Sequence, residues 1–172
     1  MKKSGIELRE LNELVDAVLV APDGLIAFDG CLGAGKTTLA TAVAKGLGRP
    51  MVDFDDYIER EKGHFVGALD ITRLKSKLDA EFAQSDVVLA SGACMQEVLM
   101  RMGYTAALNI YVQRNTSAGL AGDQDFLDVE DGYEPHPDIL HFWTPLDHEI
   151  FAYHRKHRPK ANANIIFVRV SD

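Results

Sequence analysis

The sequence contains little of what several protein classes need. Its 172 residues include two cysteines, Cys31 and Cys94, which are far apart and form no C-x-x-C pair. This usage suits a reducing cytoplasm and argues against a disulfide framework or a structural zinc site. The longest uninterrupted apolar run, Ala17–Ala21, is five residues long, which is too short to span a membrane. Acids interrupt the segment after Lys2 and Lys3, so we predict no export signal.

Basic residues are also scarce. Eighteen lysines and arginines stand against 26 acids, which gives a formal net charge of −8. Nucleic acid and anionic membranes are held largely by Lys and Arg, so we expect neither as a general partner. The rest of the composition, 47% hydrophobic and 26% charged, is that of a folded globular protein. The length suits a single domain over residues 1–172.

The chain does contain a regular alternation of apolar patterns. Helical spacing predicts a first helix over residues 7–19, within an N-terminal helical region 1–21. Continuous apolar runs predict five buried strands, and helical patterns lie between them. The predicted strands are 25–28, 50–54, 86–90, 107–112 and 165–170, and the later helices are 37–47, 71–82, 95–102 and 146–157. This order favours an α/β fold in which helices cover both faces of a five-stranded parallel sheet.

One motif points to a specific chemistry. Residues 30–37 read G-C-L-G-A-G-K-T and fit the phosphate-binding pattern G-x-x-x-x-G-K-[ST], between a predicted strand and a predicted helix. The glycines let backbone N–H groups face phosphate oxygens, and the helix N-terminus adds partial positive charge. Lys36 supplies a charge for the β- and γ-phosphates, and Thr37 offers a hydroxyl to Mg²⁺. The predicted nucleotide-binding residues are Gly30, Cys31, Leu32, Gly33, Ala34, Gly35, Lys36, Thr37 and Thr38.

The inner spacing G-x-x-G-x-G-K-T, preceded by Asp29, resembles the P-loop of small-molecule kinases of the uridine kinase-like and shikimate kinase-like family. Further segments that resemble this family are 51–57, 87–99, 108–114 and 153–159. The resemblance covers most of residues 24–170. It implies a three-layer P-loop NTPase fold, ATP and Mg²⁺ as cofactors, and transfer of phosphate to a hydroxyl of a small molecule.

Acids follow the second predicted strand. In kinases of this family, an acid at this place orients or deprotonates the attacking hydroxyl, and a second acid helps to hold Mg²⁺. Asp53, Asp55 and Asp56 compete for these roles here. Alternation along a strand places Asp53 and Asp55 on the same side, and we favour Asp55 as the base and Asp53 as the metal helper. The competing interpretation is a solvated, acidic strand end.

The third predicted strand ends in Ser91-Gly92, where uridine kinase-like proteins usually carry an acid. Shikimate kinase-like proteins have a small, glycine-rich turn there, with the metal-linked acid after the second strand. The absence of an acid at this strand end therefore favours Asp53 as the metal-linked acid. Gly92 either lets a substrate approach the backbone closely or forms a plain tight turn.

Residues 114–143 change in character and predict a mobile lid with short helices. Seven acids stand there against one base, Arg114. Kinases of this type usually bring arginines over the phosphates, so Arg114 is the expected catalytic arginine. The alternative source of charge is the cluster Arg155, Lys156 and Arg158, which equally fits a solvated helix end. We interpret the acids of the lid as those of a soluble loop.

The predicted function is transfer of phosphate from ATP to a hydroxyl of a nucleoside or similar polar metabolite. The acceptor is expected between residues 54–70, the Ser91-Gly92 turn and the lid. The alternatives are a P-loop ATPase without an acceptor and a degenerate protein that binds nucleotide only. Residues 32–39 also resemble the loop of the bacterial ATPase that assists tRNA threonylcarbamoylation, a likeness that stops at the P-loop helix. The acceptor, the choice of ATP over GTP and the oligomeric state stay open.

Overall fold

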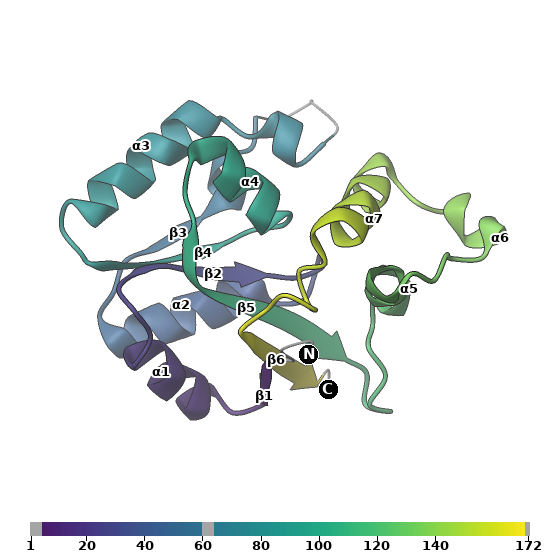
Figure 1. The fold of residues 1–172 in the computed structure, drawn as a ribbon, viewed down its shortest axis with the longest axis horizontal. Helices are drawn as coiled ribbons and strands as arrows, with labels where there is room; N and C mark the ends of the chain where they lie inside the picture. Colours follow the sequence, from purple (N-terminus) through teal and green to yellow (C-terminus); the bar gives the residue numbers. More distant parts are fainter. Residues whose placement is uncertain (1–4, 60–63, 171–172) are drawn as a thin grey trace.

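A computed structural model describes residues 5–59 and 64–170 of the chain. Its strands form one parallel sheet in the order β1-β6-β5-β2-β4-β3 (Figure 1). The strands are β1 (Ile6–Leu8), β2 (Gly24–Asp29), β3 (Met51–Asp53), β4 (Val87–Ser91), β5 (Ala106–Asn115) and β6 (Ile165–Val170). The helices are α1 (Leu11–Leu19), α2 (Lys36–Leu47), α3 (Ile71–Phe82), α4 (Met95–Met102), α5 (Gln124–Asp128), α6 (Pro137–Leu140) and α7 (Pro145–His157). Short 3₁₀ helices are η1 (Phe54–Tyr57), η2 (Val66–Ala68) and η3 (Val129–Asp131).

The α/β fold is confirmed, but the sheet has six strands where five were predicted. The additional strand is β1, which pairs with β6 through Ile6 and Ile165 at the edge of the sheet. The predicted helix 7–19 is therefore wrong at its start, because Glu7 and Leu8 belong to β1 and α1 begins at Leu11. Three residues are too few for a strand pattern to be recognised in the sequence. Pairing with a distant strand fixes their conformation.

Side-chain alternation along the central strand β2 divides the core between the two faces of the sheet. Ile26 and Phe28 are buried against α1 and α2, and Leu25 and Ala27 are buried with α3, α4 and α7. Figure 1 shows this layering, with α1 and α2 on one side of the sheet and α3 and α4 on the other. Because both faces are covered, the strands read as continuous apolar runs. In the described part of the chain, no helix is both long and apolar enough to cross a membrane.

The order of the strands creates a crevice at the carboxyl end of β2. The chain leaves β2 toward β3 and β4 on one side, and later reaches β5 and β6 on the other. In open parallel sheets, ligands bind where the strand order reverses in this way. The glycine-rich loop between β2 and α2 lies at this point.

The segment 114–143 contains the expected short helices, α5 and α6. Part of it packs firmly on the body of the protein. Leu127, Val129 and Glu130 are buried, and the ring of Phe126 stacks on Trp143 with centroids 5.2 Å apart. Residues 124–131 of the predicted lid are folded, because their apolar side chains find partners on β5 and α7.

Candidate active site

The glycine-rich loop has the backbone shape that its sequence predicts. Gly30, Gly33 and Gly35 have φ values of 145°, 72° and 85°, which L side chains rarely adopt. A Cβ atom on Gly30 would lie 2.4 Å from the carbonyl oxygen of Val112. Helix α2 begins directly after the loop, at Lys36. The N–H groups of its first turn have no partner within the helix, so the loop and helix together form an anion-binding cradle.

The predicted phosphate and metal ligands lie at the mouth of this cradle. Lys36 is 8% exposed, and its Nζ donates a hydrogen bond to the carbonyl oxygen of Cys31 at 2.7 Å. The Thr37 hydroxyl lies 3.2 Å from that of Ser91. Ser91 is in register with Asp53 on the neighbouring strand. The register thus places Asp53 at the strand end beside Ser91, and hydroxyl and carboxylate oxygens are ligands that suit Mg²⁺.

Asp55 shares a cleft with the loop. The cleft has a volume of about 210 Å³ and is lined by Leu32, Gly33, Gly35, Lys36, Thr37, Thr38, Asp55 and Ala93. Burial and the neighbouring carboxylate of Asp53 raise the pKa of Asp55, whereas the charge of Lys36 lowers it. A carboxylate with these neighbours can accept a proton from a hydroxyl bound in the cleft.

The strand-alternation argument for Asp53 and Asp55 is wrong in one respect. Strand β3 ends at Asp53, and Asp55 lies in the 3₁₀ helix η1. Asp53 Oδ1 accepts a hydrogen bond of 3.0 Å from the backbone N–H of Asp55. Asp53 therefore caps the turn that aims Asp55 into the cleft.

The Ser91-Gly92 turn is packed against η1. Ser91 is fully buried, and a Cβ atom on Gly92 would lie 2.9 Å from Cβ of Phe54. Close packing of the Phe54 side chain therefore explains the glycine, a reason that the sequence did not suggest. The packing also fixes η1 relative to β4.

Arg114 reaches the loop from β5. Its Nη1 donates to the carbonyl oxygen of Gly33 at 3.2 Å. Asp123, at the start of α5, is also near: burial raises its pKa, and the charges of Lys36 and Arg114 lower it. Asp123 therefore lies within electrostatic reach of Lys36 and Arg114, whereas the sequence analysis interprets it as an acid of a soluble loop.

The basic cluster late in the chain has other partners. Arg155 pairs with Glu134, Lys156 pairs with Glu97, and Nε of Arg158 donates to the carbonyl oxygen of Glu130. These contacts connect the cluster to the lid segment and to α4. Arg155 and Lys156 fit the solvated helix end, whereas Arg158 is partly buried against Glu130.

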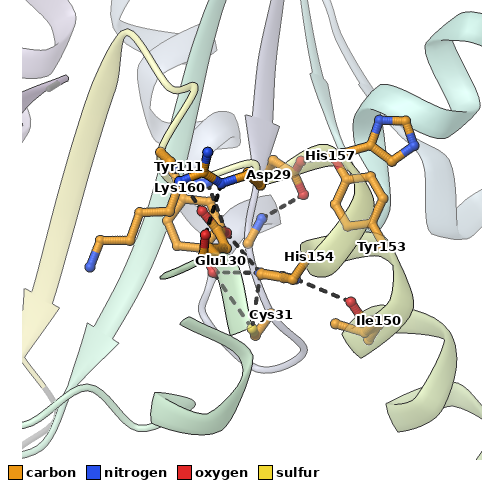
Figure 2. Close-up of polar contacts among 12 residues, drawn as sticks. Asp29, Cys31, Tyr111, Glu130, Ile150, Tyr153, His154, His157 and Lys160 are labelled. Atoms are coloured by element: carbon orange, nitrogen blue, oxygen red, sulfur yellow. Dashed lines mark hydrogen bonds and ion pairs between the residues drawn. The ribbon is translucent and has the colours of Figure 1, made fainter. Parts of the chain in front are cut away.

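A buried polar network behind the loop was not predicted (Figure 2). The hydroxyl of Tyr111 lies 2.9 Å from Nε2 of His154, and both lie near the thiol of Cys31. Burial lowers the pKa of His154 to about 4, so the ring is neutral. Its Nδ1 is 3.2 Å from the carbonyl oxygen of Ile150, which only a protonated Nδ1 can satisfy. Nε2 is then the acceptor for the Tyr111 hydroxyl.

Glu130 anchors the lid segment beside this network. Its carboxylate accepts backbone hydrogen bonds from Lys160 and Ala161, at 3.1 and 2.8 Å. Burial raises the pKa of Glu130, and these bonds lower it. Figure 2 shows the carboxylate beside His154, with Cys31 next to them. The only signal in the sequence was Tyr153-His154 within a family-like segment, which gave no hint of these partners.

Comparison with known proteins gives the family context. The family model described as shikimate kinase matches residues 32–121. A shikimate kinase of Bacteroides thetaiotaomicron is 35% identical over 100 residues, which cover 50% of this chain and 57% of that protein. A shikimate kinase of Burkholderia pseudomallei is 31% identical over 100 residues, or 52% of this chain and 54% of that protein. The chain thus spans about half the length of the curated relatives it matches.

A solved structure supports the fold over a longer range. The structure of a possible uridine kinase from Bacillus stearothermophilus has a TM-score of 0.60 and 17% sequence identity to this chain. The match covers 91% of this chain and 96% of that one. At this identity the likeness concerns the fold, and it includes the segments outside residues 32–121.

Proposed function

Since the chain belongs to the shikimate kinase family, we propose that it is an ATP-dependent phosphotransferase that phosphorylates a hydroxyl of a small polar molecule. The observation that carries this proposal is the shared cleft of Lys36, Thr37 and Asp55. Phosphate transfer to an alcohol needs phosphate-binding groups and a proton acceptor on the two sides of one reacting centre, and this cleft supplies both.

The cradle of residues 30–38 would hold the phosphates of ATP through backbone N–H groups, with Lys36 as the point charge. Thr37 and Asp53 would hold Mg²⁺, since both supply the oxygen atoms that this cation prefers. The ion would screen the negative charge of the phosphates. Arg114 is the proposed arginine of the site, because its guanidinium already contacts the loop at Gly33.

Asp55 is the proposed general base. The hydroxyl oxygen of the acceptor forms a bond to the γ-phosphorus, and the bond from that phosphorus to the β–γ bridging oxygen breaks. The hydroxyl proton passes to the Asp55 carboxylate. Its raised pKa makes this carboxylate a better proton acceptor than an ordinary aspartate.

The acceptor would lie between Asp55, residues 64–70 and the turn at 91–92. Shikimate is the first molecule to test, because the sequence relatives carry that name, and uridine is the second. A small molecule is the proposed partner, with no nucleic acid or membrane. We place the protein in the cytoplasm, a location that suits two free, buried cysteines.

The test is ATP consumption with Mg²⁺, alone and with shikimate, uridine and a panel of other alcohols, with mass detection of the phosphorylated product. Lys36→Ala is the blank. Asp55→Asn should lower kcat by about a hundredfold to ten-thousandfold and leave ATP affinity unchanged. Asp138→Asn is the matched control, since this carboxylate on α6 is 82% exposed and lies outside the cleft lining. Equal phosphorylation by wild type and Asp55→Asn would reject the assigned base.

A second function is favoured by the placement of Asp123 near Lys36 and Arg114. A carboxylate in this position can accept a proton from an attacking water, which suits an ATPase without a small-molecule acceptor. The same assay separates these functions. ATP turnover without any acceptor would favour the ATPase, and ATP binding without consumption would favour the degenerate protein.

A further inference from the structure

Arg169 contacts the P-loop from a strand that the sequence did not connect with it. The side chain is partly buried on β6, and its Nη1 donates to the carbonyl oxygen of Gly35 at 3.0 Å. Arg169 is in register with Arg114 on β5, whose Nη1 donates to the carbonyl oxygen of Gly33. Two neighbouring strands thus place guanidinium groups on two carbonyl groups of one loop.

The loop is shaped to receive this side chain. A Cβ atom on Gly35 would lie 1.6 Å from Nη1 of Arg169 and 2.8 Å from its Cζ. The guanidinium therefore packs directly against Cα of Gly35. The φ of 85° at this position is a separate reason for glycine. Glycine at position 35 therefore allows both the backbone turn and the close contact with the Arg169 guanidinium.

The carbonyl group of Gly35 has a particular place in the cradle. It also accepts the hydrogen bond of 3.0 Å from Leu39 N that opens helix α2. In a trans peptide, the C=O of one residue and the N–H of the next point in opposite directions. A second donor on the Gly35 oxygen therefore holds the Lys36 N–H outward, toward the place where the helix N-terminus receives an anion.

The charge around the loop gives Arg169 a second effect. Asp29, Asp55 and Asp123 all lie near enough to Lys36 to interact with its charge. The sequence from residue 115 to residue 143 contains no lysine or arginine. A polyphosphate entering this acidic surrounding needs compensating charge, and Arg169 adds one positive charge at the rim of the cradle.

We propose that Arg169 is a positioning residue for the nucleotide phosphates, which holds the Gly35–Lys36 peptide in its anion-binding orientation and supplies positive charge that residues 115–143 lack. This role rests on the proposed function, because it assumes that ATP binds at the loop. Arg169 acts by positioning the loop, whereas Lys36 and Asp55 are the residues proposed to take part in phosphate transfer. Preorganised donors bind an anion more tightly because they need no rearrangement.

The experiment measures binding of Mg·ATP by calorimetry to wild type, Arg169→Ala, Arg169→Lys and Arg101→Ala. Arg169→Ala should weaken ATP binding by about tenfold to a hundredfold, the effect of losing a charged hydrogen bond. Arg169→Lys should recover part of the loss. Arg101 lies on α4 beside Glu97, and its substitution is the matched control that should bind ATP as wild type does. In turnover, Arg169→Ala should raise KM for ATP and leave KM for the acceptor unchanged.

A second measurement reports the conformation of the P-loop in the protein without nucleotide. The ¹⁵N–¹H resonance of Lys36 should shift in Arg169→Ala and stay in place in Arg101→Ala. Unchanged ATP affinity and an unchanged Lys36 resonance in Arg169→Ala would overturn this role alone. If wild type binds ATP no better than Lys36→Ala does, the proposed function fails and this role fails with it.

Discussion

The hydroxyl of Tyr153 lies 2.5 Å from Oδ2 of Asp29, and this contact joins helix α7 to the residue that precedes the P-loop. The other oxygen of Asp29 accepts the backbone N–H of Gly30 at 2.8 Å. The Tyr153 hydroxyl also accepts the backbone N–H of Gln96, at the start of α4, at 3.0 Å. One phenol therefore connects three elements around a buried carboxylate. Burial raises the pKa of Asp29, and the Tyr153 hydrogen bond lowers it.

Tyr153→Phe should destabilise the protein by about 1–3 kcal/mol, because it leaves the buried Asp29 oxygen and the Gln96 N–H without their partner. The measurement is the free energy of unfolding from urea titration. Tyr133→Phe makes the same chemical change on a side chain that is 68% exposed, and should cost less than about 0.5 kcal/mol. Equal unfolding free energies for the two variants would contradict this account.

His154 should make the stability depend on pH. Its folded-state pKa of about 4 lies below the ordinary 6.5, so the unfolded chain takes up a proton that the folded protein excludes. The contribution of His154 is complete above pH 6.5. As the pH falls from 6.5 to 4, about 3 kcal/mol of stability should be lost. The titratable groups that face the ring are Glu130, Cys31, Tyr111 and Tyr153.

The raised pKa values of Asp29 and Glu130 act in the opposite direction, since these carboxyl groups bind protons more readily when folded. Comparison with His154→Gln at each pH cancels their contributions. The variant should show a shallower loss of stability on acidification, and His141→Gln, an exposed position, should follow wild type. An NMR titration that places the pKa of His154 near 6.5 would refute the explanation.

Two glycines should respond to alanine with opposite signs. Gly46→Ala, inside α2, places a Cβ 3.6 Å from Val15, an ordinary contact, and should stabilise the protein by about 0.5–1 kcal/mol. Gly92→Ala places a Cβ 2.9 Å from Phe54 and should destabilise it by about 1–3 kcal/mol. Thermal unfolding of both variants tests the pair, and shifts of the same sign would be inconsistent with the packing described.

The fold was predicted from the sequence where local pattern decides the structure. The buried runs that became β2, β4 and β6 are apolar because both faces of the sheet are covered, so their hydrophobicity marks them. The P-loop was predicted because its chemistry needs particular residues at fixed spacing. Strand β1 was missed because three residues are too few to show a hydrophobic period. They form a strand because they pair with the edge of β6.

The candidate site was predicted in its local part only. Lys36, Thr37 and Asp55 follow from motifs near strand ends, which the parallel sheet brings together. Arg169 was missed because only the register of β6 beside β5 sets it against Gly35, far away in sequence. The contact of Tyr153 with Asp29 was missed for the same reason, since no sequence pattern near Tyr153 indicates Asp29 as its partner.

The pairing of β1 with β6 has a consequence for how the protein is made. Ile6 is synthesised well before its partner Ile165, which lies 159 residues later in the sequence (165 − 6). Contacts between such distant positions carry a large loop-closure entropy and slow the search for the native topology. Until β6 arrives, the outer edge of β5 is open and can pair with other chains. The strand that carries Arg169 therefore also covers the outer edge of β5.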